Sequence, residues 1–189
     1  MQQEGIFQFV CFITNKATEE FATEWKAYRK KVGIDRTTSM LYRQTDGKNG
    51  TYHYVAKFIC PEENFQFPFS NEPKSGRFSI SQIKALQTGG YTTIQHEYNC
   101  DQKNESTTVI AFVRHKDTDL NFYNHLPLYE KLNIHQAYYE NCIYGYIMEF
   151  KVLIKNAGQL ADCLQKREGV VTGIYRNSLL NNVQNVGFY

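Results

Sequence analysis

The sequence predicts an α+β protein made of two tandem βαββαβ units with antiparallel sheets. One observation is that residues 10–14, VCFIT, match residues 110–114, IAFVR, and that both segments run into a Lys and then a Thr with an acidic neighbour. A second is that residues 52–58, YHYVAKF, match residues 144–150, YGYIMEF, in the pattern Tyr-x-Tyr-aliphatic-x-charged-Phe. Self-similarity at matched positions marks a repeated supersecondary unit, so the chain is predicted to be an internal duplication.

The composition supports a folded protein and excludes several classes of partner. The chain has 189 residues, of which 42% are hydrophobic. A chain of this length buries about 70% of the surface that its unfolded form exposes, enough for one large core or two small ones. The 21 Lys and Arg residues against 19 Asp and Glu residues give a net charge of +2, which indicates neither nucleic acid nor anionic lipid as a partner.

The first unit begins with a predicted strand at residues 6–14 and a helix at residues 18–32. Thr18 is the expected N-cap, and Glu19 and Glu20 lie where acidic side chains favour the helix dipole. One face of the helix is apolar at helical spacing, and it consists of Phe21, Trp25, Tyr28 and Val32. This face predicts packing against a core.

A hairpin follows the first helix. Its strands are predicted at residues 37–45 and 51–60, and residues 46–50, DGKNG, have turn chemistry. Residues 61–77 then form a long loop that contains Phe and Pro, and loops of this length are disproportionately functional.

The first unit closes with a short helix at residues 79–87 and a strand at residues 91–98. Gly89 and Gly90 provide the stop signal between them. The predicted order is therefore βαββαβ.

The second unit repeats this order after a polar, turn-prone segment at residues 99–105, NCDQKNE. Its elements are predicted as strand 107–115, helix 119–132, strands 134–140 and 143–153, helix 158–167 and strand 170–176. Pro127 is a possible break in the first of these helices. We predict a first unit at residues 1–100 and a second at residues 101–189, which includes a C-terminal tail.

The predicted strands are apolar on both faces, so something must cover the face that the helices leave open. Two such sheets can cover each other, either between the two units or with another copy of the chain in a homo-oligomer. This arrangement resembles the dimeric α/β-barrel superfamily of ferredoxin-like folds, which includes the antibiotic biosynthesis monooxygenase, EthD-like and stress-responsive barrel families. The resemblance is topological and covers nearly the whole chain.

The resemblance implies an α/β barrel with a cavity that binds a small molecule. In such families the chemistry is cofactor-independent oxygenation, cyclisation or dehydration of polyketides, or haem chemistry. The Asn–Trp–His set of the haem-degrading relatives does not map onto this chain, because the one Trp, Trp25, lies in the apolar face of a helix. No catalytic residue is transferred from any family.

Four polar residues on otherwise apolar strands are the candidate site: His53, Lys57, Arg114 and Glu149. In the functional interpretation they line an apolar pocket with four tyrosines, Tyr52, Tyr54, Tyr144 and Tyr146. His53 or Glu149 would then transfer a proton, and Arg114, Lys57 and the tyrosines would bind a small aromatic or polyketide-like compound. In the structural interpretation Lys57 and Glu149, at equivalent repeat positions, form an ion pair.

Neither a metal nor a cofactor is expected. Cys11, Cys60, Cys100, Cys142 and Cys163 are scattered, and no Cys or His residues have the spacing of a zinc site. A haem ligated by His125 is the remaining alternative. Reduced cysteines, the absence of a signal-peptide pattern and the absence of an apolar run of about 20 residues predict a cytoplasmic protein without a membrane span.

Two other functions remain open. Tyr144-Gly145-Tyr146-Ile147 resembles the centre of the RNP1 strand of RNA-recognition motifs, which share the βαββαβ order, although the Lys/Arg-Gly that precedes this strand is absent. RNA binding would require these aromatics on an exposed sheet. The second alternative is a non-enzymatic interaction module, in which residues 64–69, NFQFPF, dock on a partner protein.

Overall fold

The computed structural model describes residues 5–34, 39–45, 51–59, 83–98 and 105–177. They form one closed antiparallel barrel with the strand order β1-β3-β2-β8-β5-β7-β6-β4. The strands are β1 (Phe7–Thr14), β2 (Ser39–Gln44), β3 (Tyr54–Ile59), β4 (Ile83–Tyr98), β5 (Ser106–Val113), β6 (Lys131–Ala137), β7 (Tyr146–Leu153) and β8 (Val170–Asn177). The helices of the described residues are α1 (Thr18–Val32), α2 (Ile154–Gln165) and the 3₁₀ helix η2 (Leu120–His125).

The strand order repeats itself halfway around the barrel. Four strands run β1-β3-β2-β8 and the next four run β5-β7-β6-β4, so β3 and β7 occupy equivalent places. The pairs β2–β8 and β4–β6 join the two halves of the chain and close the barrel within one molecule. The division into units at residues 1–100 and 101–189 stays a prediction.

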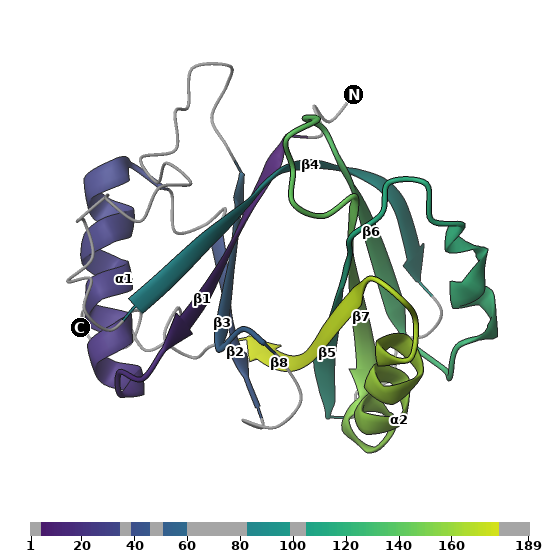
Figure 1. Ribbon diagram of the computed structural model, residues 1–189. Helices are drawn as coiled ribbons and strands as arrows, with labels where there is room; N and C mark the ends of the chain where they lie inside the picture. The colour runs from purple at the N-terminus through teal and green to yellow at the C-terminus, as the bar shows by residue number, and fades with distance from the viewer. Residues whose placement is uncertain (1–4, 35–38, 46–50, 60–82, 99–104, 178–189) are drawn as a thin grey trace.

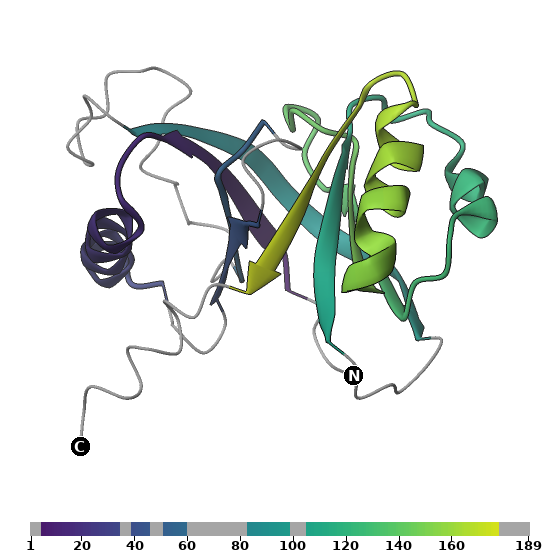
Figure 2. The ribbon, with the colours of Figure 1, turned by 90° about the horizontal axis from the view of Figure 1, so that it is seen from below.

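Helices cover the outside of the barrel on two opposite sides, as Figures 1 and 2 show. On one side α1 packs Phe21 and Trp25 against Phe12 of β1, with ring centroids 5.2 and 5.8 Å apart. On the other side Leu160 and Leu164 of α2 are buried in a core cluster that β5 to β8 share with η2. The helix at residues 18–32 is confirmed, but its N-cap is Ala17 rather than Thr18.

A third core cluster fills the inside of the barrel, because alternate residues of each strand point inward. Its buried members include Phe9, Cys11, Val55, Tyr91, Ile110, Phe112, Ile147 and Tyr175. The strands are thus apolar on both faces because each face has its own core.

The predicted α+β fold class is wrong. In place of two ferredoxin-like units, the described residues form a mostly β structure, a closed barrel of eight antiparallel strands with two α-helices. A ferredoxin-like α/β barrel built from two βαββαβ units would carry four helices. The strand segments were located approximately, but two of the expected helices do not form in the described residues.

The first missing helix is the one expected at residues 79–87. Residues 83–87 belong instead to β4, a strand of 16 residues whose first half pairs with β1 and whose second half pairs with β6. Gly89 does not end a helix. It lies at an irregularity in the β1–β4 pairing and has φ 126°, a conformation that favours glycine.

The second missing helix is the one expected at residues 119–132. It is reduced to η2, and Leu126 is extended, with φ −78° and ψ 157°. Leu126 precedes Pro127, and the proline ring disfavours helical backbone in the residue before it. The chain then enters β6 at Lys131, three residues earlier than the predicted strand.

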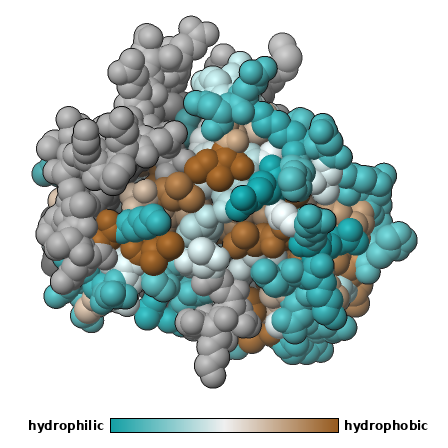
Figure 3. All heavy atoms as spheres, in the orientation of Figure 1, coloured by the Kyte–Doolittle hydropathy of each residue, from teal (hydrophilic) through white to brown (hydrophobic). Residues whose placement is uncertain are grey.

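Polar residues predominate at the periphery of the face seen in Figure 3, and apolar residues gather towards its middle. Within the described part of the chain, no helix has the length and apolar character needed to cross a membrane. The predicted loop at residues 61–77, with its segment 64–69, lies outside the described residues, as do Cys60 and Cys100.

Candidate functional site

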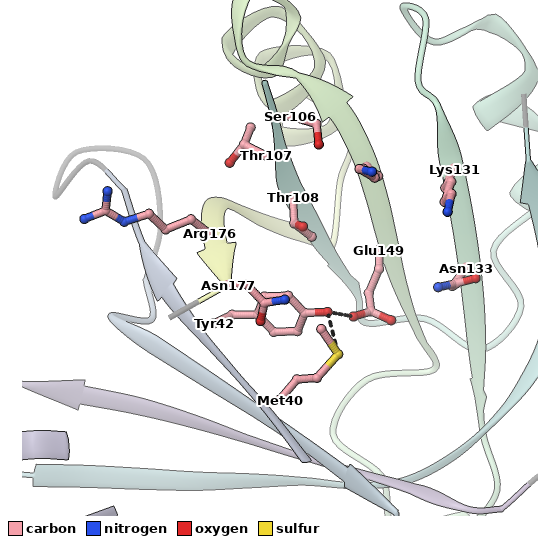
Figure 4. A pocket seen from close by; sticks show the side chains of 11 residues that line it. Met40, Tyr42, Ser106, Thr107, Thr108, Lys131, Asn133, Glu149, Arg176 and Asn177 are labelled. Carbon is pink, nitrogen blue, oxygen red and sulfur yellow. Dashed lines mark hydrogen bonds between the residues drawn. The ribbon is translucent and has the colours of Figure 1, made fainter. Parts of the chain in front are cut away.

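A cavity of about 360 Å³ opens at one end of the barrel, and we call it the mouth pocket. Its walls come from the first residues of β5 and β6, the last residues of β7 and β8, and from β2. They include Tyr42 of β2, Thr108 of β5, Asn133 of β6, Glu149 and Lys151 of β7, and Asn177 of β8 (Figure 4). Most of the lining residues carry polar groups.

Glu149 is the centre of a buried polar network in the wall of the mouth pocket. Lys57 Nζ donates a hydrogen bond to Glu149 Oε2 at 2.7 Å, and His135 Nε2 lies 2.6 Å from the same oxygen. The Tyr42 hydroxyl donates to Oε1 at 2.6 Å (Figure 4). Glu149 is only 5% exposed and His135 1%. Both carboxylate oxygens thus have donors, as a buried charge requires.

Strand register brings these side chains together. Glu149 lies opposite Asn133 in the β6–β7 pair, and His135 follows two residues later on the same face of β6. Lys57 comes from β3 and Tyr42 from β2, both from the other half of the chain. The network therefore exists only in the closed barrel.

The network fixes the charges of its members. Burial raises the pKa of Glu149, but the Lys57 ammonium and the His135 ring outweigh it and hold that pKa well below its ordinary value. Burial lowers the pKa of His135, although Glu149 opposes this. At neutral pH Glu149 is therefore a carboxylate and His135 is neutral.

The hydrogen bonds fit a single tautomer of the neutral His135 ring. Its Nε2–H donates to Glu149, and its Nδ1, 3.0 Å from Thr93 Oγ1, accepts from the Thr93 hydroxyl. Both ring nitrogens are thus engaged, and the low pKa of Glu149 makes that carboxylate a weak base.

The ammonium of Lys57 also faces two aromatic rings. Its Nζ lies 4.5 Å from the centroid of Phe7 and 5.8 Å from that of Phe9. Such contacts partly replace the water that the buried cation has lost.

The structure brings together two of the candidate residues proposed from the sequence and separates the others. Lys57 and Glu149 form the ion pair of the structural interpretation. His53 lies at the opposite end of the barrel, where its Nδ1 accepts a hydrogen bond from Thr14 N–H at 2.9 Å. Arg114 is exposed and directly follows the last residue of β5, whose first residue, Ser106, lines the mouth pocket. His53 and Arg114 are therefore not among the residues that line the mouth pocket with Glu149.

The four candidate tyrosines also divide into two pairs. Tyr52 and Tyr144 precede β3 and β7 and turn into the barrel, where both are buried in the inner core. Tyr54 and Tyr146 begin these strands and belong to the two outer cores. The Tyr54 hydroxyl contacts Thr18 Oγ1 at 3.4 Å, and the Tyr146 hydroxyl donates to the carbonyl of Lys116 at 3.0 Å. None of the four lines the mouth pocket.

The mouth pocket differs from the apolar, tyrosine-lined pocket expected from the sequence, since Tyr42 is its one aromatic lining residue and most of its other lining residues are polar. The apolar pocket itself stays a prediction. His135 and Tyr42 are not among the candidate residues proposed from the sequence. The sequence held one signal for His135, because apolar and polar residues alternate along residues 131–137, KLNIHQA. Leu132 and Ile134 lie on one face of this strand, so His135 points to the other. The helix assigned to residues 119–132 covered the start of that strand.

The described residues contain no group of three or more His, Cys, Asp or Glu side chains placed to hold a metal ion. His125, the haem-ligand alternative, is exposed at the last position of η2. The aromatics of the RNP1-like segment are buried: Tyr144 is 2% exposed and Tyr146 9%. These two rings therefore offer no surface on which bases could stack.

In comparisons with known proteins, no family model matches the chain, and no curated protein is significantly similar to it.

Proposed function

We propose that this protein binds a small polar molecule in the mouth pocket. The observation that carries the proposal is a 360 Å³ cavity inside the end of the barrel, with the buried network of Glu149 in its wall. A cavity of this size is in the range of small-molecule sites, in which a few fixed polar groups orient the ligand. The many polar side chains of the lining favour a ligand that carries polar groups.

We propose binding rather than turnover as the primary function. A cyclase or dehydratase needs a base or acid that can exchange a proton with its substrate. Glu149 is held as a weakly basic carboxylate by three donors, and both nitrogens of His135 are engaged. Proton transfer by Glu149 would therefore require the ligand to displace one of these donors.

A ligand screen with a pocket-filling variant tests the proposal. Thermal shift and ligand-observed NMR against small polar compounds should give hits with the wild-type protein. Asn177→Trp, at the exposed rim of the pocket, should weaken every hit by filling the entrance. Glu168→Trp, at an exposed position between α2 and β8, is the matched control. Hits that survive Asn177→Trp unchanged would place binding elsewhere and contradict the proposal.

A further inference from the structure

Two lysines lie directly opposite each other at the entrance of the mouth pocket. Lys131 of β6 and Lys151 of β7 are cross-strand partners, and both line the pocket. Like charges at directly opposed positions of a sheet are destabilising. Lys151 Nζ lies 4.0 Å from Oε2 of Glu130, the limit of an ion pair. The Lys131–Lys151 pair thus places two cationic side chains next to each other in the wall of the pocket.

Hydrogen-bond donors extend this pair into a row across three strands. Thr108 of β5 is the other cross-strand partner of Lys151, so Lys131, Lys151 and Thr108 lie side by side on the inner face of the barrel. Hydroxyl and ammonium donors at adjacent positions suit the several lone pairs of one carboxylate or phosphate group.

Asn133 adds an oriented donor next to this row. His96 Nδ1 and Asn133 Oδ1 are in hydrogen-bond contact, which occupies the amide oxygen. The amide nitrogen points towards the side of the pocket that holds Glu149 (Figure 4). Asn133 therefore presents N–H groups to the pocket rather than a carbonyl.

The carboxylate of Glu149 does not make the pocket acidic. Its charge is balanced by Lys57 at 2.7 Å, and both of its oxygens already accept hydrogen bonds. Arg176 also lines the pocket, but its side chain extends away from Glu149 (Figure 4). The lining groups that face a ligand are thus mainly donors and cations.

We propose that the ligand of the mouth pocket carries an oxyanion, a carboxylate or a phosphate, that is bound by Lys131, Lys151 and Thr108. This inference rests on the proposed function, and it names the chemical class of the ligand. The remainder of the ligand lies deeper in the pocket, beside Tyr42 and Met40.

Isothermal titration with benzoate and benzamide tests this class, because the two compounds have nearly the same shape and differ in charge. Wild-type protein should bind benzoate at least tenfold more tightly than benzamide, since hydrogen bonds to charged groups are the strong ones. Inorganic phosphate should compete with benzoate. Lys131→Met and Lys151→Met should each weaken benzoate about tenfold and leave benzamide unchanged.

Lys155→Met, at an exposed position on α2 outside the pocket, is the control and should not change either affinity. In urea denaturation without ligand, Lys131→Met should unfold in a cooperative transition like that of the wild type, because methionine keeps the apolar stem of this partly exposed side chain. Lys131→Met should thus separate ligand binding from folding.

Equal affinity for benzoate and benzamide, no binding of benzoate, or benzoate affinity unchanged in both lysine variants would overturn the oxyanion proposal. If neutral compounds then bind and Asn177→Trp weakens their binding, the mouth pocket remains a binding site and only its preference for anions is contradicted. If no compound of either charge binds in the pocket, the proposed function fails as well.

Discussion

The hydroxyl oxygens of Tyr52 and Tyr144 lie 2.5 Å apart inside the barrel, at equivalent positions of the repeated Tyr-x-Tyr pattern. Two further tyrosines fix the backbone beside them. Tyr175 donates to the carbonyl of Tyr52 at 3.1 Å, and the Tyr91 hydroxyl lies 3.1 Å from the carbonyl of Tyr144. Tyrosines thus fill the end of the barrel that lies away from the mouth pocket.

The Tyr52–Tyr144 contact predicts strong coupling between two conservative substitutions. Tyr52→Phe or Tyr144→Phe alone should lower the free energy of unfolding by about 1–2 kcal/mol, because the remaining buried hydroxyl loses its partner. The double variant should cost no more than either single one. Urea denaturation of all four proteins measures this. Tyr146 is the control, because its hydroxyl bonds to the carbonyl of Lys116 on the outer face of the barrel. The stability losses of Tyr146→Phe and Tyr52→Phe should add in the double variant. If the losses of unfolding free energy of Tyr52→Phe and Tyr144→Phe add up in their double variant, the hydrogen bond between the two hydroxyls is contradicted.

The ion pair of Lys57 and Glu149 predicts a second non-additive result. Glu149→Leu should lower the free energy of unfolding by about 3–5 kcal/mol, because Lys57 becomes an unpaired buried cation. Adding Lys57→Met should recover much of this loss, since no charge then remains buried at the pair. The urea midpoint should be highest for the wild type, lower for the double variant and lowest for Glu149→Leu. A double variant less stable than Glu149→Leu would show that the ion pair is not the main contribution of these residues.

The pKa shifts of Glu149 and His135 predict that stability rises with pH in the acid range. Both folded-state pKa values lie below the ordinary ones, 4.5 and 6.5, so the unfolded chain binds more protons than the folded one. The contribution of His135 should therefore be lost as pH falls below about 6.5, and that of Glu149 as pH falls below about 4.5.

Urea denaturation at pH 5 and pH 7.5 tests the histidine contribution. Wild-type protein should be less stable at pH 5, and His135→Gln should reduce this difference. The exposed His115→Gln is the matched control and should retain it. If the two variants behave alike, His135 is not the group that titrates.

Gly89 predicts a strongly destabilising substitution. Its φ of 126° is unfavourable for any other residue, and an added Cβ would overlap the sulfur of Cys142. Gly89→Ala should therefore lower the free energy of unfolding by about 2–4 kcal/mol. Gly158→Ala, in α2 with open space at its Cβ, should raise stability by about 0.5–1 kcal/mol. Thermal denaturation of both variants checks the contrast, and similar melting temperatures would contradict it.

Local patterns in the sequence were sufficient for several elements. The amphipathic spacing of residues 18–32 predicted α1, and apolar segments predicted strands where β5, β7 and β8 form. The repeat placed Lys57 and Glu149 at equivalent positions, and the barrel pairs them. These features depend on residues close in sequence or on a match that the sequence itself displays.

Tertiary structure alone decided the fold class and the site. Residues 83–88 became a strand because β1 offers them a complete antiparallel partner, whereas a short helix there would bury no comparable surface. Tyr52 points inward and Tyr54 outward because β3 begins between them. The network of Tyr42, His135 and Glu149 joins β2, β6 and β7. Contacts between strands so distant in sequence stabilise the protein only once the barrel closes, so no local pattern records them.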